Sequence, residues 1–223
     1  MNIKRLKQKS ELDVLVLDIE FLIISVVQGV ALAALASFAV PIFAAFKIEY
    51  FPYIFSGFLF ILLFWSGAII HALSFIDWPL DLPHNFLYFL ASFIEVVAFG
   101  QMSNPKMWFL MVTIFFMVAE ILYFVDLGLI KKRQKAFDTT ISKKLYKHII
   151  ERHLFEMKVL VPAGTLFNFI GLVLIVSYEQ IFLTYNWHIL LISLQLLFSL
   201  GLMFNSIWSF NSRSKLITAN LSN

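Results

Sequence analysis

Long runs of apolar residues constrain the fold of this sequence more than any other feature. Several runs exceed the roughly 18 apolar residues that are typical of a membrane-spanning helix, and residues 21–46 form one of them. Only 14% of the 223 residues are charged, whereas a soluble domain carries roughly a quarter. So few charges could not cover the surface of a water-exposed globule. The sequence therefore predicts a protein whose main solvent is the lipid bilayer.

We expect one all-α membrane domain over residues 1–223: a polytopic membrane helix bundle of about six transmembrane helices plus one cytoplasmic amphipathic helix. The expected parts are a cytoplasmic lead-in (1–20), four spans (21–130), a cytoplasmic amphipathic linker (131–158), two spans (159–210) and a cytoplasmic tail (211–223). In the linker, Phe137, Ile141, Leu145 and Ile149 recur at every fourth residue among lysines. This pattern is typical of an amphipathic helix that lies on the membrane surface.

The basic residues predict the orientation of the bundle. With the N-terminus inside, almost all lysines and arginines fall in the cytoplasmic pieces, and only Lys47 and Lys106 face outward. By the positive-inside rule, this bias predicts that both termini are cytoplasmic. The excess of basic residues lies beside membrane spans, so we interpret it as a topology signal and expect no nucleic-acid partner.

Several classes of protein are excluded or left without support by missing features. The chain has no cysteine, which excludes disulfides, thiolate metal sites and thiol catalysis. No cleavable signal peptide is visible, because Asp13, Asp18 and Glu20 interrupt the stretch after the basic start. The sequence also lacks a potassium-channel filter, a voltage-sensor arginine ladder, and the GxSxG and HExxH motifs. We find no resemblance to a known family.

Two glutamates deep within apolar segments are the main functional candidates. Glu95 lies in the expected third span and Glu120 in the fourth, and the turn "QMSNPK" joins these spans. An ionised carboxylate in hydrocarbon needs a buried partner, water or a proton, so such a residue is a functional-site hypothesis by default. Counted from the turn, the two carboxylates differ in depth by roughly 12 Å, so we expect no direct contact between them.

Two interpretations of these glutamates stay open. In the first, they line a polar path for a cation or proton together with Gln28 and Asn168, and Asp126, Asp18 and Glu20 form an acidic vestibule at its cytoplasmic mouth. In the second, the glutamates bind Gln28, Asn168 or Gln195 on neighbouring helices and hold the bundle together, while the vestibule acids pair with lysines or reach water.

The nearest approach to a metal site is a set of two imidazoles and two carboxylates around one expected inner loop. Such a set suits zinc, manganese or iron, but two prolines interrupt it and its spacing matches no established ligand pattern. A solvated loop or helix caps are the alternative interpretation. The residues of this set are His71, Asp77, Asp81 and His84.

Small and polar residues share faces on three of the expected spans, which favours close contact between helices. The first such face contains Asp18, Ser25, Gly29 and Ala36. The fifth span presents Gly164, Asn168 and Gly171 on one face, and the sixth span presents Gln195, Ser199, Ser206 and Ser209.

Three functions are compatible with the sequence. The first is a small transporter or channel for a cation, proton or small solute, with intramembrane carboxylates on its path. The second is a non-catalytic subunit, assembly factor or immunity-type protein that binds another membrane protein. The third is an intramembrane lipid-modifying enzyme that uses His71 with Asp77, Asp81 or Glu120 as acid and base. Besides the lipid bilayer, a second copy of the chain or another membrane protein is a candidate partner; we expect no cofactor except a bound cation.

Overall fold

The computed structural model describes the chain except residues 1–2, 76–80, 137–139 and 222–223; within it, the side chains of residues 3–14, 70–75, 133, 136, 140–145, 210 and 212–221 are not described. Every regular element of the described residues is helical. In chain order, these elements are α1 (Ile3–Ala44), η1 (Ile48–Tyr50), α2 (Phe51–Phe75), α3 (Leu82–Phe99), α4 (Pro105–Ala136), α5 (Thr140–Phe155), η2 (Glu156–Leu160), α6 (Val161–Ser177), η3 (Gln180–Thr184) and α7 (His188–Leu221).

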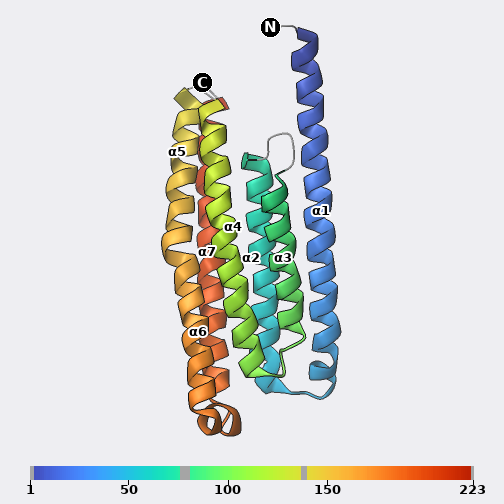
Figure 1. Cartoon of the computed structure of the whole chain (residues 1–223), viewed down its shortest axis with the longest axis vertical. Helices are drawn as coiled ribbons and strands as arrows, with labels where there is room; N and C mark the ends of the chain where they lie inside the picture. The colour runs from blue at the N-terminus through green and yellow to red at the C-terminus, as the bar shows by residue number, and fades with distance from the viewer. Residues whose placement is uncertain (1–2, 76–80, 137–139, 222–223) are drawn as a thin grey trace.

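The helices form one bundle in which successive spans run in opposite directions, so that the start of α1 and the end of α7 lie at the same end (Figure 1). Six segments within the described residues are long and apolar enough to cross a membrane. The prediction of an all-α, six-span membrane bundle is therefore confirmed. The segments are Leu15–Ala44, Ile48–Ile69, Leu82–Phe99, Pro105–Lys132, Tyr146–Ser177 and His188–Ser209.

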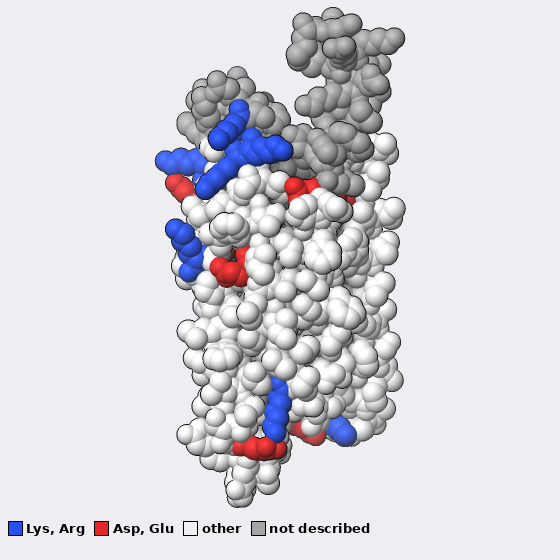
Figure 2. Space-filling model, viewed as in Figure 1, with Lys and Arg blue, Asp and Glu red and all other residues white. Residues whose placement is uncertain are grey.

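The two ends of the bundle differ in their charged residues. Described lysines gather at the end of α4 and on the neighbouring part of α5, and we call this end of the bundle the basic end (Figure 2). At the opposite end, the Nζ of Lys106 lies 2.7 Å from a carboxylate oxygen of Glu179. On the face shown in Figure 2, most of the surface between the two ends carries no charged residue, as a lipid-facing belt requires.

Helix α1 packs against α2 and α3 along a stripe that recurs every three or four residues, which is the spacing of one helix face. This stripe is not the small-residue face predicted for the first span. Asp18, Ser25, Gly29 and Ala36 are all exposed on α1, so they do not form the contact face of α1 with the other described helices. The buried stripe consists of Val16, Glu20, Ile24, Gln28, Ala31, Leu35, Ala39 and Ile42.

The expected amphipathic helix exists, but its orientation differs from the prediction. Instead of lying across the end of the bundle, α5 runs alongside α4 and continues through the π-helical turn η2 into α6 (Figure 1). Pro162 follows this turn and has no N–H to donate, and a π-turn accommodates such a gap in the helical hydrogen bonds. Tyr146 and Ile149 of α5 are buried against Ile130 of α4. The described apolar residues Tyr146 and Ile149 are therefore covered by protein, whereas Phe137 and the side chains of Ile141 and Leu145 lie outside the described part of the chain.

Helix α4 lies at the centre of the packing and contacts both α3 and α6. Two glycines of α6 allow this close approach. A Cβ atom at Gly164 would lie 2.5 Å from the ring of Phe116, and one at Gly171 would lie 2.8 Å from the ring of Phe109. The face predicted for the fifth span is thus a contact face within the bundle.

Candidate functional site

A cavity of about 180 Å³ lies in the half of the bundle nearer the basic end, between α2, α3, α4, α5, η2, α6 and α7. Its lining is amphipathic. Aromatic rings from α2 and α4 form one part, and polar side chains from α3, α4, α5, η2 and α7 form the other. The polar lining residues are Ser66, His84, Tyr88, Tyr123, Asp126, His153, Glu156, Asn205, Ser206 and Ser209.

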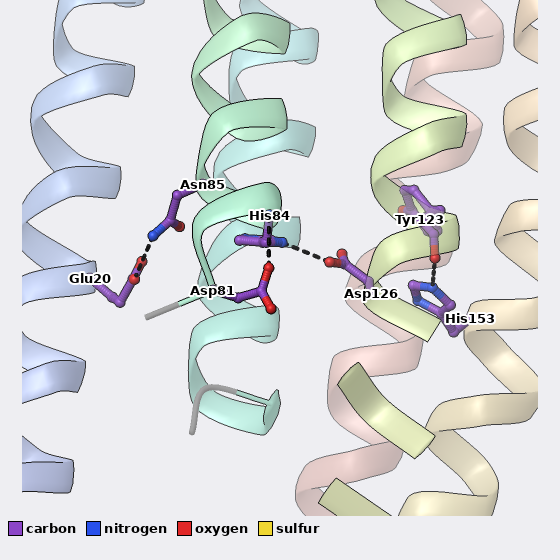
Figure 3. A network of polar contacts seen from close by, with 7 residues as sticks. All are labelled: Glu20, Asp81, His84, Asn85, Tyr123, Asp126 and His153. Atoms are coloured by element: carbon purple, nitrogen blue, oxygen red, sulfur yellow. Dashed lines mark hydrogen bonds and ion pairs between the residues drawn. The ribbon is translucent and has the colours of Figure 1, made fainter. Parts of the chain in front are cut away.

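The first polar contact of the cavity joins α3 to α4. Nδ1 of His84 lies 2.7 Å from Oδ1 of Asp126, and both residues are buried. Asp81 ends the preceding linker and caps α3, because its Oδ1 accepts the backbone N–H of His84 at 3.0 Å. Figure 3 shows His84 between these two carboxylates. The cap fixes the first turn of α3 and so positions the imidazole beside Asp126.

A second set of polar contacts joins α4 to α5 and η2. Nε2 of His153 lies 2.7 Å from the backbone oxygen of Tyr123 (Figure 3), and the two rings stack with centroids 4.8 Å apart. The Tyr123 hydroxyl donates to Oε2 of Glu156 at 3.3 Å. Oε1 of Glu156 accepts from Nε of Arg152 at 2.7 Å. The π-turn that begins at Glu156 thereby directs a carboxylate toward the cavity.

The hydrogen-bond partners determine which ring nitrogens carry protons. A carboxylate oxygen and a backbone oxygen can only accept, so Nδ1 of His84 and Nε2 of His153 both donate. Each imidazole therefore donates one of its ring N–H groups to another group of the protein. When neutral, each ring retains only an acceptor nitrogen.

The aromatic part of the cavity lies deeper in the bundle. Phe64 stacks on Tyr88 with centroids 4.9 Å apart and meets Phe115 edge to face at 5.5 Å. Phe60 contacts Phe115 and Phe116 with centroids about 6 Å apart. Rings in these tilted and stacked arrangements are stabilised beyond their buried area, which makes this wall well defined.

Tyr88 separates the cavity from a second buried polar group that contains Glu95. Nε2 of Gln28 donates to the Tyr88 hydroxyl at 3.2 Å and lies 3.5 Å from Oγ of Ser92. Glu95 follows Ser92 by three residues, so both lie on the same face of α3. Glu95 is only 2% exposed. Neither of its carboxyl oxygens has a hydrogen-bond partner among the described residues. Oε1 of Gln28 is also buried without one.

The polar residues of α3 form a line along its buried face. His84, Tyr88, Ser92 and Glu95 are all buried and recur every three or four residues. At 1.5 Å per residue, this line is about 16 Å long. Beyond Glu95, toward the opposite end, Leu35 of α1, Gly57 of α2 and Phe99 of α3 form a tight apolar contact. A Cβ atom at Gly57 would lie 3.0 Å from both Leu35 and Phe99, so α1, α2 and α3 close the bundle there.

The acidic residues predicted for the path do not all lie at the site. Asp126 lines the cavity, whereas Glu120 is half-buried on α4 and is not among the lining residues. Asp18 is exposed on α1. Glu20 is 4% exposed, and its Oε1 accepts from Nδ2 of Asn85 at 3.4 Å (Figure 3). Gln28 contacts Tyr88 and Ser92, which lie on the same face of α3 as Glu95.

Asn168 and Gln195 belong to a different network, which connects α4, α6 and α7. Nε1 of Trp108 donates to Oε1 of Gln195 at 2.9 Å, and Nε2 of Gln195 donates to Oδ1 of Asn168. Nδ2 of Asn168 donates in turn to the backbone oxygen of Gly164 at 2.8 Å. These bonds occupy both ends of each amide, which is the role of polar residues that hold membrane helices together.

The candidate metal set is only partly described. The side chain of His71 and all of Asp77 lie outside the described residues. Asp81 caps α3, and His84 contacts Asp126. Within the described part of the chain, no three metal-ligating side chains converge, so the metal site stays a prediction from the sequence.

Six polar residues of the cavity were not predicted from the sequence: Ser66, Tyr88, Tyr123, His153, Glu156 and Asn205. His153 and Glu156 were assigned to the cytoplasmic linker. A signal existed for Tyr88, which is four residues after His84 and seven before Glu95. This spacing places all three on one helix face.

Comparisons with protein-family models, with curated proteins and with solved structures found no significant match. The site is therefore interpreted from its own geometry.

Proposed function

We propose that this multi-pass membrane protein is a small transporter for a proton or a monovalent cation, with Glu95 as the intramembrane group that carries the ion. The observation behind this proposal is the isolation of the Glu95 carboxyl group. It is buried, and neither of its oxygens has a partner among the described residues. Burial of an ionised carboxylate without compensation is too costly to persist.

The atoms around Glu95 favour a positive ion. Both oxygens of Glu95 and Oε1 of Gln28 are buried acceptors for which the described residues supply no donor. A proton on Glu95 would convert one of these acceptors into a donor. A small cation would instead use them as oxygen ligands, which hard cations prefer. Either ion satisfies the group, and an anion does not.

The remaining geometry supports a transporter rather than an open channel. The polar line on α3 connects Glu95 with the cavity near the basic end. On the other side of Glu95, Leu35, Gly57 and Phe99 pack too closely for an ion to pass. Release toward the opposite end therefore requires a rearrangement of α1, α2 and α3. We also propose that the basic end faces the cytoplasm, as the positive-inside rule predicts.

Flux into liposomes tests this function. Liposomes with the purified protein are given a gradient of H⁺, Na⁺ or K⁺ in separate experiments, and ion movement is followed with an internal dye. We expect the wild type to dissipate at least one gradient and Glu95→Gln to reduce the rate to that of empty liposomes, because the amide can neither bind a proton nor neutralise a cation. Glu179→Gln is the matched control, since Glu179 is exposed at the opposite end. A folded Glu95→Gln variant with wild-type flux would contradict the proposal.

A second function is favoured by one specific observation. The small-residue face of α1, from Asp18 to Ala36, is exposed and is not covered by another helix of the described part of the chain; Gly29 has nothing within 4 Å of the position of a Cβ atom. This surface is suited to close contact with a helix of another membrane protein. This exposed face therefore supports an accessory subunit as the second candidate function. The cavity and Glu95 do not require a partner protein.

A further inference from the structure

Two polar side chains of α7 line the cavity without a partner in the described part of the chain. Asn205 and Ser206 are half-buried lining residues, and no hydrogen bond or ion pair joins either side chain to another described residue. Polar side chains of membrane helices ordinarily bond to a neighbouring helix, as Gln195 of the same helix does with Asn168. The amide of Asn205 and the hydroxyl of Ser206 are therefore available to a molecule in the cavity.

The charged side chains of the lining already have partners within the protein. Asp126 contacts His84 (Figure 3). Glu156 accepts from the Tyr123 hydroxyl and forms an ion pair with Arg152. A charged ligand would have to displace one of these partners, because a charge that is buried without compensation is costly. The lining therefore favours an uncharged molecule.

The size of the cavity limits the rest of the ligand. A volume of about 180 Å³ is slightly larger than the engineered cavity of about 150 Å³ that holds benzene. The apolar part lies between Phe60 and Phe64 of α2 and Phe115 and Phe116 of α4, whose rings contact one another. This part can therefore accommodate about one ring or a short branched chain.

We propose that this cavity binds an uncharged molecule of about one ring that carries a hydroxyl group. A hydroxyl group both donates and accepts hydrogen bonds, as do the amide of Asn205 and the hydroxyl of Ser206. The ligand hydroxyl bonds to these two side chains, and the ring packs against the phenylalanines of α2 and α4. Neither of the two α7 side chains takes part in the proposed ion path through Glu95, so the inference goes beyond ion transport and does not rest on it.

Calorimetric titration of the full-length protein in lipid nanodiscs, near neutral pH, tests this inference. The probes are 2-phenylethanol, 2-phenylethylamine and 3-phenylpropionate, which resemble one another in size but carry a neutral, a cationic and an anionic group. Nanodiscs without the protein measure the uptake of each probe by the lipid. We expect the alcohol to bind and each ion to bind at least about tenfold more weakly, because the cavity offers no uncompensated charge. Absence of alcohol binding, or binding of either ion as tight as that of the alcohol, would overturn the inference.

A matched pair of variants locates the binding site. Asn205→Leu keeps the approximate size of the side chain and removes its amide. No bond to a described residue is lost, so we expect this variant to fold and to bind the alcohol at least about threefold more weakly. Asn211→Leu makes the same change at an exposed position of α7 outside the cavity and should leave binding unchanged.

Unchanged alcohol binding by folded Asn205→Leu overturns the site. If that variant does not fold, Ser206→Ala replaces it, since it removes only one hydroxyl group. Weaker alcohol binding by Ser206→Ala supports the site, and unchanged binding overturns it.

The results for the two proposals are independent. Alcohol binding that persists while Glu95→Gln has no effect on flux would remove the ion-transport proposal alone. Glu95-dependent flux without alcohol binding would remove this inference alone.

Discussion

Tyr88 is the residue that connects the two polar parts of the molecule. Its ring lines the cavity and stacks on Phe64, while its hydroxyl accepts a hydrogen bond from Gln28, which also contacts Ser92 on the face of α3 that carries Glu95. A change on one side can therefore reach the other through a single side chain. Removal of this hydroxyl would leave the buried amide of Gln28 without that acceptor, and an unsatisfied buried donor is costly.

Replacement of Tyr88 by phenylalanine separates the two roles of this residue. The ring remains stacked on Phe64, so we expect the thermal unfolding temperature to change little. The hydroxyl is lost, so Gln28 loses an acceptor, and we expect Glu95-dependent flux to fall. Thermal unfolding in detergent and liposome flux on the same preparation measure both effects. Wild-type flux in Tyr88→Phe would show that the hydroxyl plays no part in the ion path.

The sequence identified the intramembrane carboxylates but could not rank them. Glu95 and Glu120 lie at similar distances from the basic ends of their segments. The expectation that an ionisable residue within a span is functional applies equally to both. Their difference comes from helix rotation: Glu95 faces the bundle, whereas Glu120 is half-buried outside the cavity. Rotation depends on packing against neighbouring helices, which the sequence of one span does not contain.

At the scale of the helices, the contact between α4 and α6 determines how tightly the bundle closes. Gly164→Ala would place a methyl group 2.5 Å from the ring of Phe116. Because overpacking of a tight contact costs about 1–3 kcal/mol, we expect a lower thermal unfolding temperature in detergent.

Gly201→Ala is the matched control for this prediction. Gly201 lies on α7 with nothing within 4 Å of the position of a Cβ atom. Alanine favours helix over glycine by up to about 1 kcal/mol, so the same change should be neutral or slightly stabilising there. An equal loss of stability in both variants would contradict the packing described for α4 and α6.

The number of spans and their helical structure could be predicted from the sequence. Which helices contact one another could be predicted only in part. The glycine face of the fifth span does contact another helix, and the corresponding face of the first span does not. Small residues permit close approach but do not specify which helix approaches. The same limit applies to α5, since its apolar face could be covered by lipid or by α4, and the sequence pattern is identical in both cases.

For the whole molecule, orientation is the property that gives the polar line its direction. We expect the basic end to face the cytoplasm. Since the chain contains no cysteine, a single introduced cysteine gives an unambiguous label. In intact cells, a membrane-impermeant maleimide should label Ser103→Cys, in the turn at the opposite end, and should not label Lys135→Cys at the basic end. The reverse pattern would invert the proposed topology.

The central claim is that Glu95 carries an ion through the membrane, and its most direct test is the flux rate of Glu95→Gln relative to wild type, at equal amounts of folded protein in liposomes. Because the ion would lose a buried carboxylate that no described residue satisfies, we predict a rate reduced by about tenfold or more. A ratio near one would contradict the claim.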